Sequence, residues 1–213
     1  MQGIFYNQFS SSYIPEILHE IYRDKVYTPF IEDRKDLIVL DVGANIGLFS
    51  QYVSPFSKQV YAIEPSNIHT RSLNEMVKFN KLSNVITIKK ALSNKNGTAT
   101  FYHNTNETMF SLDERVKDTE EKEEVETITL DKLLKDFNIE KVDFMKLDVE
   151  GSEGKIIGSR EFEEACKKIE TIVFEYHSWS GFNPFQLVNN LKDYGYTVNK
   201  LGTQANLYSA TRL

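Results

Sequence analysis

Three side chains that can exchange protons follow apolar segments of the chain. Asp148 and Glu150 come after the apolar run that begins at Val142, and His177 follows the run 169–176. If these runs are parallel strands, the three side chains lie at strand carboxyl ends, where open α/β sheets place their binding sites. A carboxylate or a histidine there can accept the proton of a reacting hydroxyl group. We rank His177 first as the base because its unperturbed pKa lies near neutrality, and a structural histidine is the alternative.

The segment from Leu37 to Ser50 has the pattern of a cofactor-binding turn. Its apolar start, 37–40, is typical of a parallel strand covered on both faces, and an amphipathic helix follows. Gly43 and Gly47 lie between them, where the absence of a side chain allows close approach of a ligand or of the next helix. The sequence therefore predicts a nucleotide-type cofactor over this turn, with tight packing as the alternative role of the glycines.

The neighbouring polar residues narrow the choice of cofactor. Asn45 stands where the second glycine of the dinucleotide pattern GxGxxG would admit a pyrophosphate, so a ligand without a diphosphate fits better. Glu64 ends the next apolar strand 23 residues after Asp41, near the spacing at which an acidic residue binds ribose hydroxyls. Asp41 and Glu64 together predict an adenosine whose other end carries an amine or a cation.

A third segment, VDFMKLDVEGSE from Val142 to Glu153, completes a set of motifs. Together with DVGANIGLFS, it resembles the FkbM family of S-adenosylmethionine-dependent methyltransferases. Three further segments match in order and in spacing: AIEP at 62–65, ALS at 91–93 and TLDKLL at 129–134. The resemblance covers about residues 37–177.

The resemblance implies S-adenosylmethionine as the cofactor and assigns residues to it. It places Asp41, Gly43, Asn45 and Gly47 around the methionine and ribose, Glu64 on the ribose hydroxyls, and Ala91, Leu92 and Ser93 beside the adenine. Methyl transfer then needs alignment of acceptor and methyl, exclusion of water and, for a hydroxyl acceptor, a base. The candidates for catalysis are Asp148, Glu150 and His177.

A divalent ion is an alternative use of Asp148 and Glu150. Hard cations usually take more oxygen donors, and the sequence shows no third ligand, so we predict no metal site. Lys146 projects from the same side of its strand as Asp148, because side chains on a strand alternate with a period of two. Lys146 serves either as a charge partner that fixes Asp148 or in catalysis.

The bulk composition predicts a globular protein without a nucleic-acid or membrane partner. Its 213 residues carry a net charge of −6, which disfavours attraction to nucleic acid and to anionic membranes. The lone Cys166 has no CxxC or Cys/His neighbour and indicates a reducing compartment. No apolar stretch approaches the roughly 18 residues that span a bilayer, and no signal-peptide pattern opens the chain, so we predict a cytoplasmic location.

The order of the segments predicts one α/β domain over 37–213, preceded by a helical extension over 1–36. We expect a doubly wound, mostly parallel seven-stranded sheet, the Rossmann-like class I methyltransferase fold, with a C-terminal antiparallel hairpin. Strands are expected at 37–42, 59–64, 84–91, 142–148, 169–176, 196–201 and 206–211. Helices are expected at 46–54, 66–80, 131–137, 158–168 and 184–194, with Asp131 as the cap of the third.

Other segments leave alternatives open. The β-type run 98–103 predicts an added strand, and 124–130 alternates as a strand would. Residues 113–126 hold eight acidic and three basic side chains, which favours a solvated loop, with a mobile flap as the alternative. The helical pattern before residue 36 predicts either a helix over one sheet edge or a lid over the cofactor, and aromatic residues within 1–13 indicate a homodimer contact.

The sequence thus predicts an S-adenosylmethionine-dependent enzyme that methylates a hydroxyl group on a sugar, a glycan or a small metabolite. An N-methyltransferase, which would not need His177 as a base, is one alternative. A non-catalytic cofactor-binding module that regulates a partner is another. Asn45 and the C-terminal hairpin disfavour an NAD-binding oxidoreductase.

Overall fold

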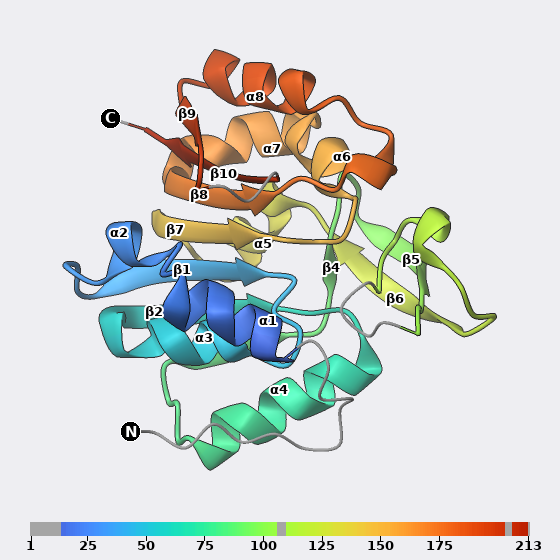
Figure 1. Ribbon diagram of the computed structural model, residues 1–213, viewed down its shortest axis with the longest axis horizontal. Helices are drawn as coiled ribbons and strands as arrows, with labels where there is room; N and C mark the ends of the chain where they lie inside the picture. The colour runs from blue at the N-terminus through green and yellow to red at the C-terminus, as the bar shows by residue number, and fades with distance from the viewer. Residues whose placement is uncertain (1–13, 106–109, 203–205, 213) are drawn as a thin grey trace.

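The computed structural model describes residues 14–105, 110–202 and 206–212, and it shows a central sheet between two layers of helices (Figure 1). Seven strands form this sheet in the order β3-β2-β1-β7-β8-β10-β9. Only the pairs that include β10 are antiparallel, so the C-terminal hairpin inserts one antiparallel strand as predicted. The strands are β1 Leu37–Val42, β2 Ser57–Ile63, β3 Val85–Ile88, β7 Val142–Leu147, β8 Ile169–Glu175, β9 Thr197–Lys200 and β10 Leu207–Thr211.

The helices cover the sheet on both faces. One layer consists of α1 Ile14–Leu18, the π-helix η1 His19–Arg23, α2 Thr28–Ile31, α3 Leu48–Val53, the short turn η2 Ser54–Phe56 and α4 Asn67–Phe79. The other consists of α5 Leu130–Asp136, α6 Glu153–Ile157, α7 Arg160–Ala165, η5 Cys166–Lys168 and α8 Pro184–Asp193, with η6 Ser178–Ser180 before the last. Each layer buries its apolar side chains in a separate core.

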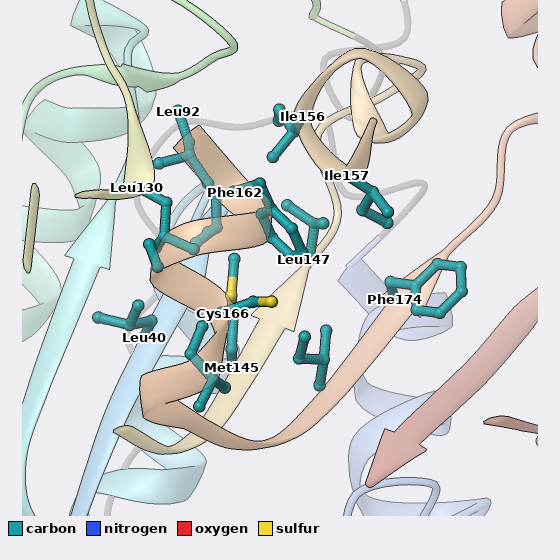
Figure 2. Close-up of a cluster of buried hydrophobic side chains, with 14 of the residues drawn as sticks. Leu40, Leu92, Leu130, Met145, Leu147, Ile156, Ile157, Phe162, Cys166 and Phe174 are labelled. Carbon is teal, nitrogen blue, oxygen red and sulfur yellow. The ribbon is translucent and has the colours of Figure 1, made fainter. Parts of the chain in front are cut away.

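The alternation of side chains along β1 connects the two cores. Leu40 and Val42 belong to the core under α5 to α8, while Leu37 and Val39 belong to the opposite one. Figure 2 shows Leu40 and Met145 of the sheet facing Phe162 and Cys166 on the chain around α7. Because the sheet is buried on both faces, its strand ends are fixed positions for side chains.

A second, three-stranded sheet lies beside the main sheet, and the sequence predicted only part of this second sheet. It has the order β4-β6-β5, with β4 Ala91–Leu92, β5 Gly97–Tyr102 and β6 Lys122–Ile128. The prediction of one strand over 84–91 is wrong, because β3 ends before Lys89 and the chain turns so that Ala91 and Leu92 pair with β6. In Figure 1, β5 and β6 stand beyond the ends toward which the parallel strands point.

The acidic segment 113–126 is more ordered than predicted. It contains the short turn η4 Glu114–Val116, and its last residues form the start of β6, which pairs antiparallel with β5. In β6, Val125 is buried while Glu124 and Glu126 are exposed, so the charges occupy the solvent face of a strand. The prediction of a solvated loop is therefore wrong for the residues from 122 onward. The strand predicted over 124–130 is present as β6, shifted by two residues toward the N-terminus.

The helix boundaries also differ in two places. Thr129 is the N-terminal cap of α5, so Asp131 lies in the first turn, and its prediction as the cap is wrong. The predicted helix 158–168 is shorter, and α6 precedes it as a separate five-residue helix. A segment of that length has too few residues to show a helical period.

The N-terminal extension is described from residue 14 onward. Ile21 and Ile31 are buried in the core that covers one face of the sheet. The aromatic residues within 1–13 lie outside the described residues, so the dimer contact and the domain division at residue 36 stay predictions. Among the described helices, none is both long and apolar enough to cross a lipid bilayer.

Candidate functional site

A cavity of about 500 Å³ lies at the carboxyl ends of four parallel strands. The turn after β1, the residues after β2 and β7, and the last residue of β8 form its floor. The N-terminal segment and the small sheet form its sides. Among the lining residues are Glu20, Gly43, Glu64, Asp148, Glu150 and Glu175. Such a strand-end cavity is where open α/β sheets bind ligands.

The turn after β1 is held by packing that only glycine permits. Gly43 has φ +77°, and a Cβ atom there would lie 1.7 Å from the carbonyl oxygen of Asp148. Gly47 has φ +90°, and its Cβ atom would lie 2.3 Å from Cε of Met76 and 2.5 Å from Cδ1 of Leu73. Gly47 therefore serves the packing of α4, the alternative that the sequence left open. Gly43 both packs on Asp148 and lines the cavity.

Glu64 ties the end of β2 to this turn. Its Oε2 accepts a hydrogen bond of 2.9 Å from the backbone N–H of Asn45, and its Oε1 accepts one of 2.9 Å from that of Ser66. Asn45 has φ +50°, a left-handed conformation that asparagine tolerates. A carboxylate has about four acceptor positions, so the oxygens of Glu64 retain capacity for hydroxyl donors such as those of a ribose. Glu64 lines the cavity, as predicted for a ribose-binding residue.

The predicted cofactor residues divide into two groups. Gly43, Asn45, Glu64, Ala91 and Leu92 line the cavity, whereas Asp41, Gly47 and Ser93 lie outside its described wall. Asp41 is fully buried, accepts a hydrogen bond of 2.6 Å from Oγ of Ser50, and has its pKa raised by burial. Asp41 is thus bonded to Ser50 of α3 beneath the turn, and its predicted contact with the methionine or ribose stays a prediction.

At the opposite end of the cavity, Lys146 pairs with Asp148. Lys146 Nζ lies 2.9 Å from Oδ2 of Asp148, and the lysine side chain is 12% exposed. Burial lowers the pKa of Lys146, but Asp148 and Asp41 outweigh burial and hold it above its ordinary value. Of the two predicted roles of Lys146, the geometry favours the charge partner.

His177 is held between two carboxylates. Its Nε2 lies 3.1 Å from Oε2 of Glu150, and its Nδ1 lies 3.0 Å from Oε1 of Glu153. Burial lowers the pKa of His177, but these two hydrogen bonds outweigh it and raise the pKa to about 12. The ring is therefore a cation at neutral pH. The ranking of His177 as the base rested on an unperturbed pKa, and that premise is wrong.

Two carboxyl groups of the site were missed from the sequence. Glu20 of η1 lines the cavity and accepts a hydrogen bond from the hydroxyl of Tyr27. Nothing in the sequence places Glu20 beside residues that lie more than 100 positions away. Glu175 also lines the cavity, and its position at the end of a predicted strand, two residues before His177, was a usable signal.

Three possible metal ligands lie close together: Asp148, Glu175 and His177 each offer one atom within 4.8 Å of the others. The structure therefore brings a third candidate ligand near Asp148, which the sequence pattern did not show. However, both nitrogens of His177 already bind carboxylates, and Asp148 is paired with Lys146. A metal ion would have to displace these partners before it could bind Asp148 and His177. The prediction of no metal site stays a prediction.

Apolar and aromatic side chains close the cavity from two sides. Phe101, Phe110 and Leu112 come from the small sheet and the chain after it, and the ring of His103 stacks on Phe110 at 4.2 Å. Ile17 and Ile21 come from the N-terminal segment. This segment thus both packs on the sheet and forms a wall of the cavity, which favours the predicted lid.

Comparison with known proteins adds family and fold relationships. Residues 41–198 match the family model of the methyltransferase FkbM domain. The methyltransferase sdnD of Sordaria araneosa is 28% identical over 217 aligned positions, which cover 86% of this chain and 82% of that protein. Protein arginine N-methyltransferase 1 of rice (Oryza sativa) is 42% identical to this chain over 80 residues. That match covers 35% of this chain and 20% of the rice protein.

A solved structure has the same fold. The methyltransferase FkbM from Methylobacillus flagellatus superimposes with a TM-score of 0.59 and 14% identity, over 92% of this chain and 50% of that one. The chain therefore spans only part of the length of some of the proteins it matches.

Proposed function

Because the chain belongs to the FkbM methyltransferase family, we propose that it transfers a methyl group from S-adenosylmethionine to a hydroxyl group on a sugar, a glycan or a small metabolite. One observation carries the proposal. A single cavity joins the carboxylate of Glu64 and the apolar pair Ala91 and Leu92 to a cluster of carboxyl groups at the ends of β7 and β8. Glu64 with Ala91 and Leu92 suits the adenosine of the cofactor. The cluster of carboxyl groups suits the place where the acceptor reacts.

The chain's own residues fit this cofactor. Glu64 presents carboxylate oxygens with remaining acceptor capacity for ribose hydroxyls, and Ala91 and Leu92 offer an apolar surface to a flat purine. Asp148, whose pKa lies below its ordinary value because Lys146 and His177 outweigh its burial, places a negative charge near the opposite end. When bound, S-adenosylmethionine supplies an activated methyl group on a positively charged sulfur.

The walls of the cavity contribute alignment and exclusion of water. Ile17 and Ile21 cover one side and Phe110 and Leu112 the other, so an acceptor lies between apolar surfaces. Holding both reactants in one orientation and removing water from the charged centre are the main contributions that a methyl transfer needs from its protein.

A second candidate, methylation of a cationic nitrogen, is favoured by the charge of the lining. Four carboxyl groups line the part of the cavity away from Glu64, namely Glu20, Asp148, Glu150 and Glu175. An amine or guanidinium would be attracted to such a surface. The similarity to an arginine N-methyltransferase agrees with this candidate over its matched 80 residues.

Calorimetric titration tests the cofactor. We expect S-adenosylhomocysteine to bind at about micromolar affinity and NAD not to bind. Glu64→Gln keeps the size of the side chain but removes its charge, and we expect it to weaken binding about 10-fold to 100-fold. Glu170→Gln, on the far end of β8 where Glu170 pairs with Lys141 and Arg34, is the matched control. Binding of NAD, or of neither compound, would refute the proposal.

Transfer of labelled methyl from S-adenosylmethionine to a cell extract tests the reaction. Isolation of the labelled product and identification of the methylated atom separates an oxygen acceptor from a nitrogen acceptor. Tight binding of the cofactor without any labelled product would instead indicate the non-catalytic module.

A further inference from the structure

The geometry points to Glu175 as the group that accepts the proton of a hydroxyl acceptor, an inference that rests on the function proposed above. Five carboxyl side chains line the cavity, and four already accept a hydrogen bond. The donors are the backbone N–H groups of Asn45 and Ser66 to Glu64, the hydroxyl of Tyr27 to Glu20, the ammonium of Lys146 to Asp148, and Nε2 of His177 to Glu150. The fifth, Glu175, has no hydrogen-bond partner for its side chain among the described residues.

The position of Glu175 also suits the role. It ends β8, beside the end of β7, and its carboxyl lies within 4.8 Å of ligand atoms on Asp148 and His177. Leu207 of β10, which pairs with Glu175, and Asn206 just before it also line the cavity. An acceptor that reaches the strand ends therefore meets a carboxyl to which no described residue donates a hydrogen bond.

Burial and the neighbouring carboxylates make Glu175 a stronger base than an ordinary carboxylate. Burial first, and then the negative charge of Asp148, raise the pKa of Glu175 to about 8. The groups that face it from the packed elements are Asp148 after β7, Glu150 and His177 in the following loops, and Glu20 and Tyr27 of the N-terminal segment. His177 lowers this pKa, but burial, together with the negative charges of Asp148, Glu150 and Glu20, outweighs it. A base with a pKa near the working pH is the one that general base catalysis favours.

The proton transfer completes a balanced reaction. The acceptor oxygen forms a bond to the methyl carbon, the bond from that carbon to sulfur breaks, and its electron pair stays on the sulfur. The proton of the acceptor hydroxyl passes to a carboxylate oxygen of Glu175. Solvent then removes it, which returns Glu175 to its starting state.

Carbon-13 NMR of protein labelled at the glutamate carboxyl carbons tests the position of Glu175 without any turnover. We expect one carboxyl to titrate near pH 8 and to vanish in Glu175→Gln but not in Glu170→Gln. Addition of S-adenosylmethionine places a cation nearby and should lower this pKa by about one unit or more, whereas the neutral sulfur of S-adenosylhomocysteine should shift it less. An equal shift with both compounds, or none, would overturn the inference.

Turnover with methyl-labelled S-adenosylmethionine and the cell extract tests the role. We expect Glu175→Gln to lower the rate about 100-fold to 10,000-fold and to remove the rise of rate with pH, because general base catalysis contributes about that much. Glu175→Asp should restore part of the rate, and Glu170→Gln should leave it unchanged. A Glu175→Gln enzyme with the wild-type rate and pH profile would refute the role of Glu175.

The two tests separate this inference from the function on which it rests. Failure of the wild-type protein to bind S-adenosylhomocysteine would contradict the proposed function itself. If the wild type binds that compound and Glu175→Gln binds it with affinity within about threefold, any loss of turnover is assigned to Glu175 and not to cofactor binding.

Discussion

The two ends of the cavity are built on different principles. At the cofactor end, the turn from Gly43 to Gly47 and the carboxylate of Glu64 are fixed by backbone hydrogen bonds and by close packing. At the acceptor end, carboxyl groups from three segments, namely η1, the chain after β7 and the end of β8, lie around two cations, Lys146 and His177. The first end depends on shape and the second on charge balance, so mutation and pH should affect them differently.

The largest expected effect is at the cofactor end. Gly43→Ala puts a Cβ atom 1.7 Å from a backbone carbonyl oxygen and imposes φ +77° on an alanine. We expect a loss of about 4 kcal/mol or more in the free energy of unfolding, because the strained conformation and the clash add. Urea denaturation measures the loss. Gly97→Ala shares a positive φ but meets nothing within 4 Å, so it isolates the clash. Equal losses in both variants would contradict packing as the reason for Gly43.

A smaller effect is expected when the charge balance of the acceptor end is broken. Lys146→Met leaves Asp148 without its hydrogen-bonded cation and Asp41 without the charge that lowers its pKa. Removal of one partner of a buried pair should cost about 3 kcal/mol in the free energy of unfolding. Lys141→Met is the matched control on the same stretch of chain. Lys141 is 62% exposed and pairs with Asp143 and Glu170, so its loss should cost at most about 1 kcal/mol. Similar losses in the two variants would show that burial does not strengthen the inner pair.

The smallest effect appears as a dependence on pH. The pKa of His177 is raised in the folded protein to about 12. The charged ring therefore stabilises the folded protein fully below the unfolded pKa of about 6.5, and this stabilisation declines as pH rises toward the folded pKa. The difference in unfolding free energy between wild type and His177→Gln should therefore fall by about 1 kcal/mol from about pH 7 to about pH 8. Urea denaturation at both pH values measures it, and a constant or growing difference would contradict a protonated His177.

The same contrast explains what the sequence predicted well and what it did not. The strands of the parallel sheet and the place of Glu64 at the end of β2 follow from apolar runs that end in polar residues, a signal contained within each segment. The state of His177 depends on Glu150 and Glu153, whose orientation toward the ring is set by the loop that folds back after β7. Glu20 reaches the cavity from an extension that matched no motif. Roles set by contacts between distant segments cannot be predicted from local patterns.

The small sheet has one more consequence. Phe101 and Phe110 face the cavity, yet they pack with Ala91 and Val125 in a third apolar cluster, apart from the two cores of the main sheet. Sequence change in β5 and the chain after it therefore alters the shape offered to an acceptor without disturbing the packing beneath the cofactor turn. The small sheet thus lets one wall of the cavity vary independently of the packing of the parallel sheet.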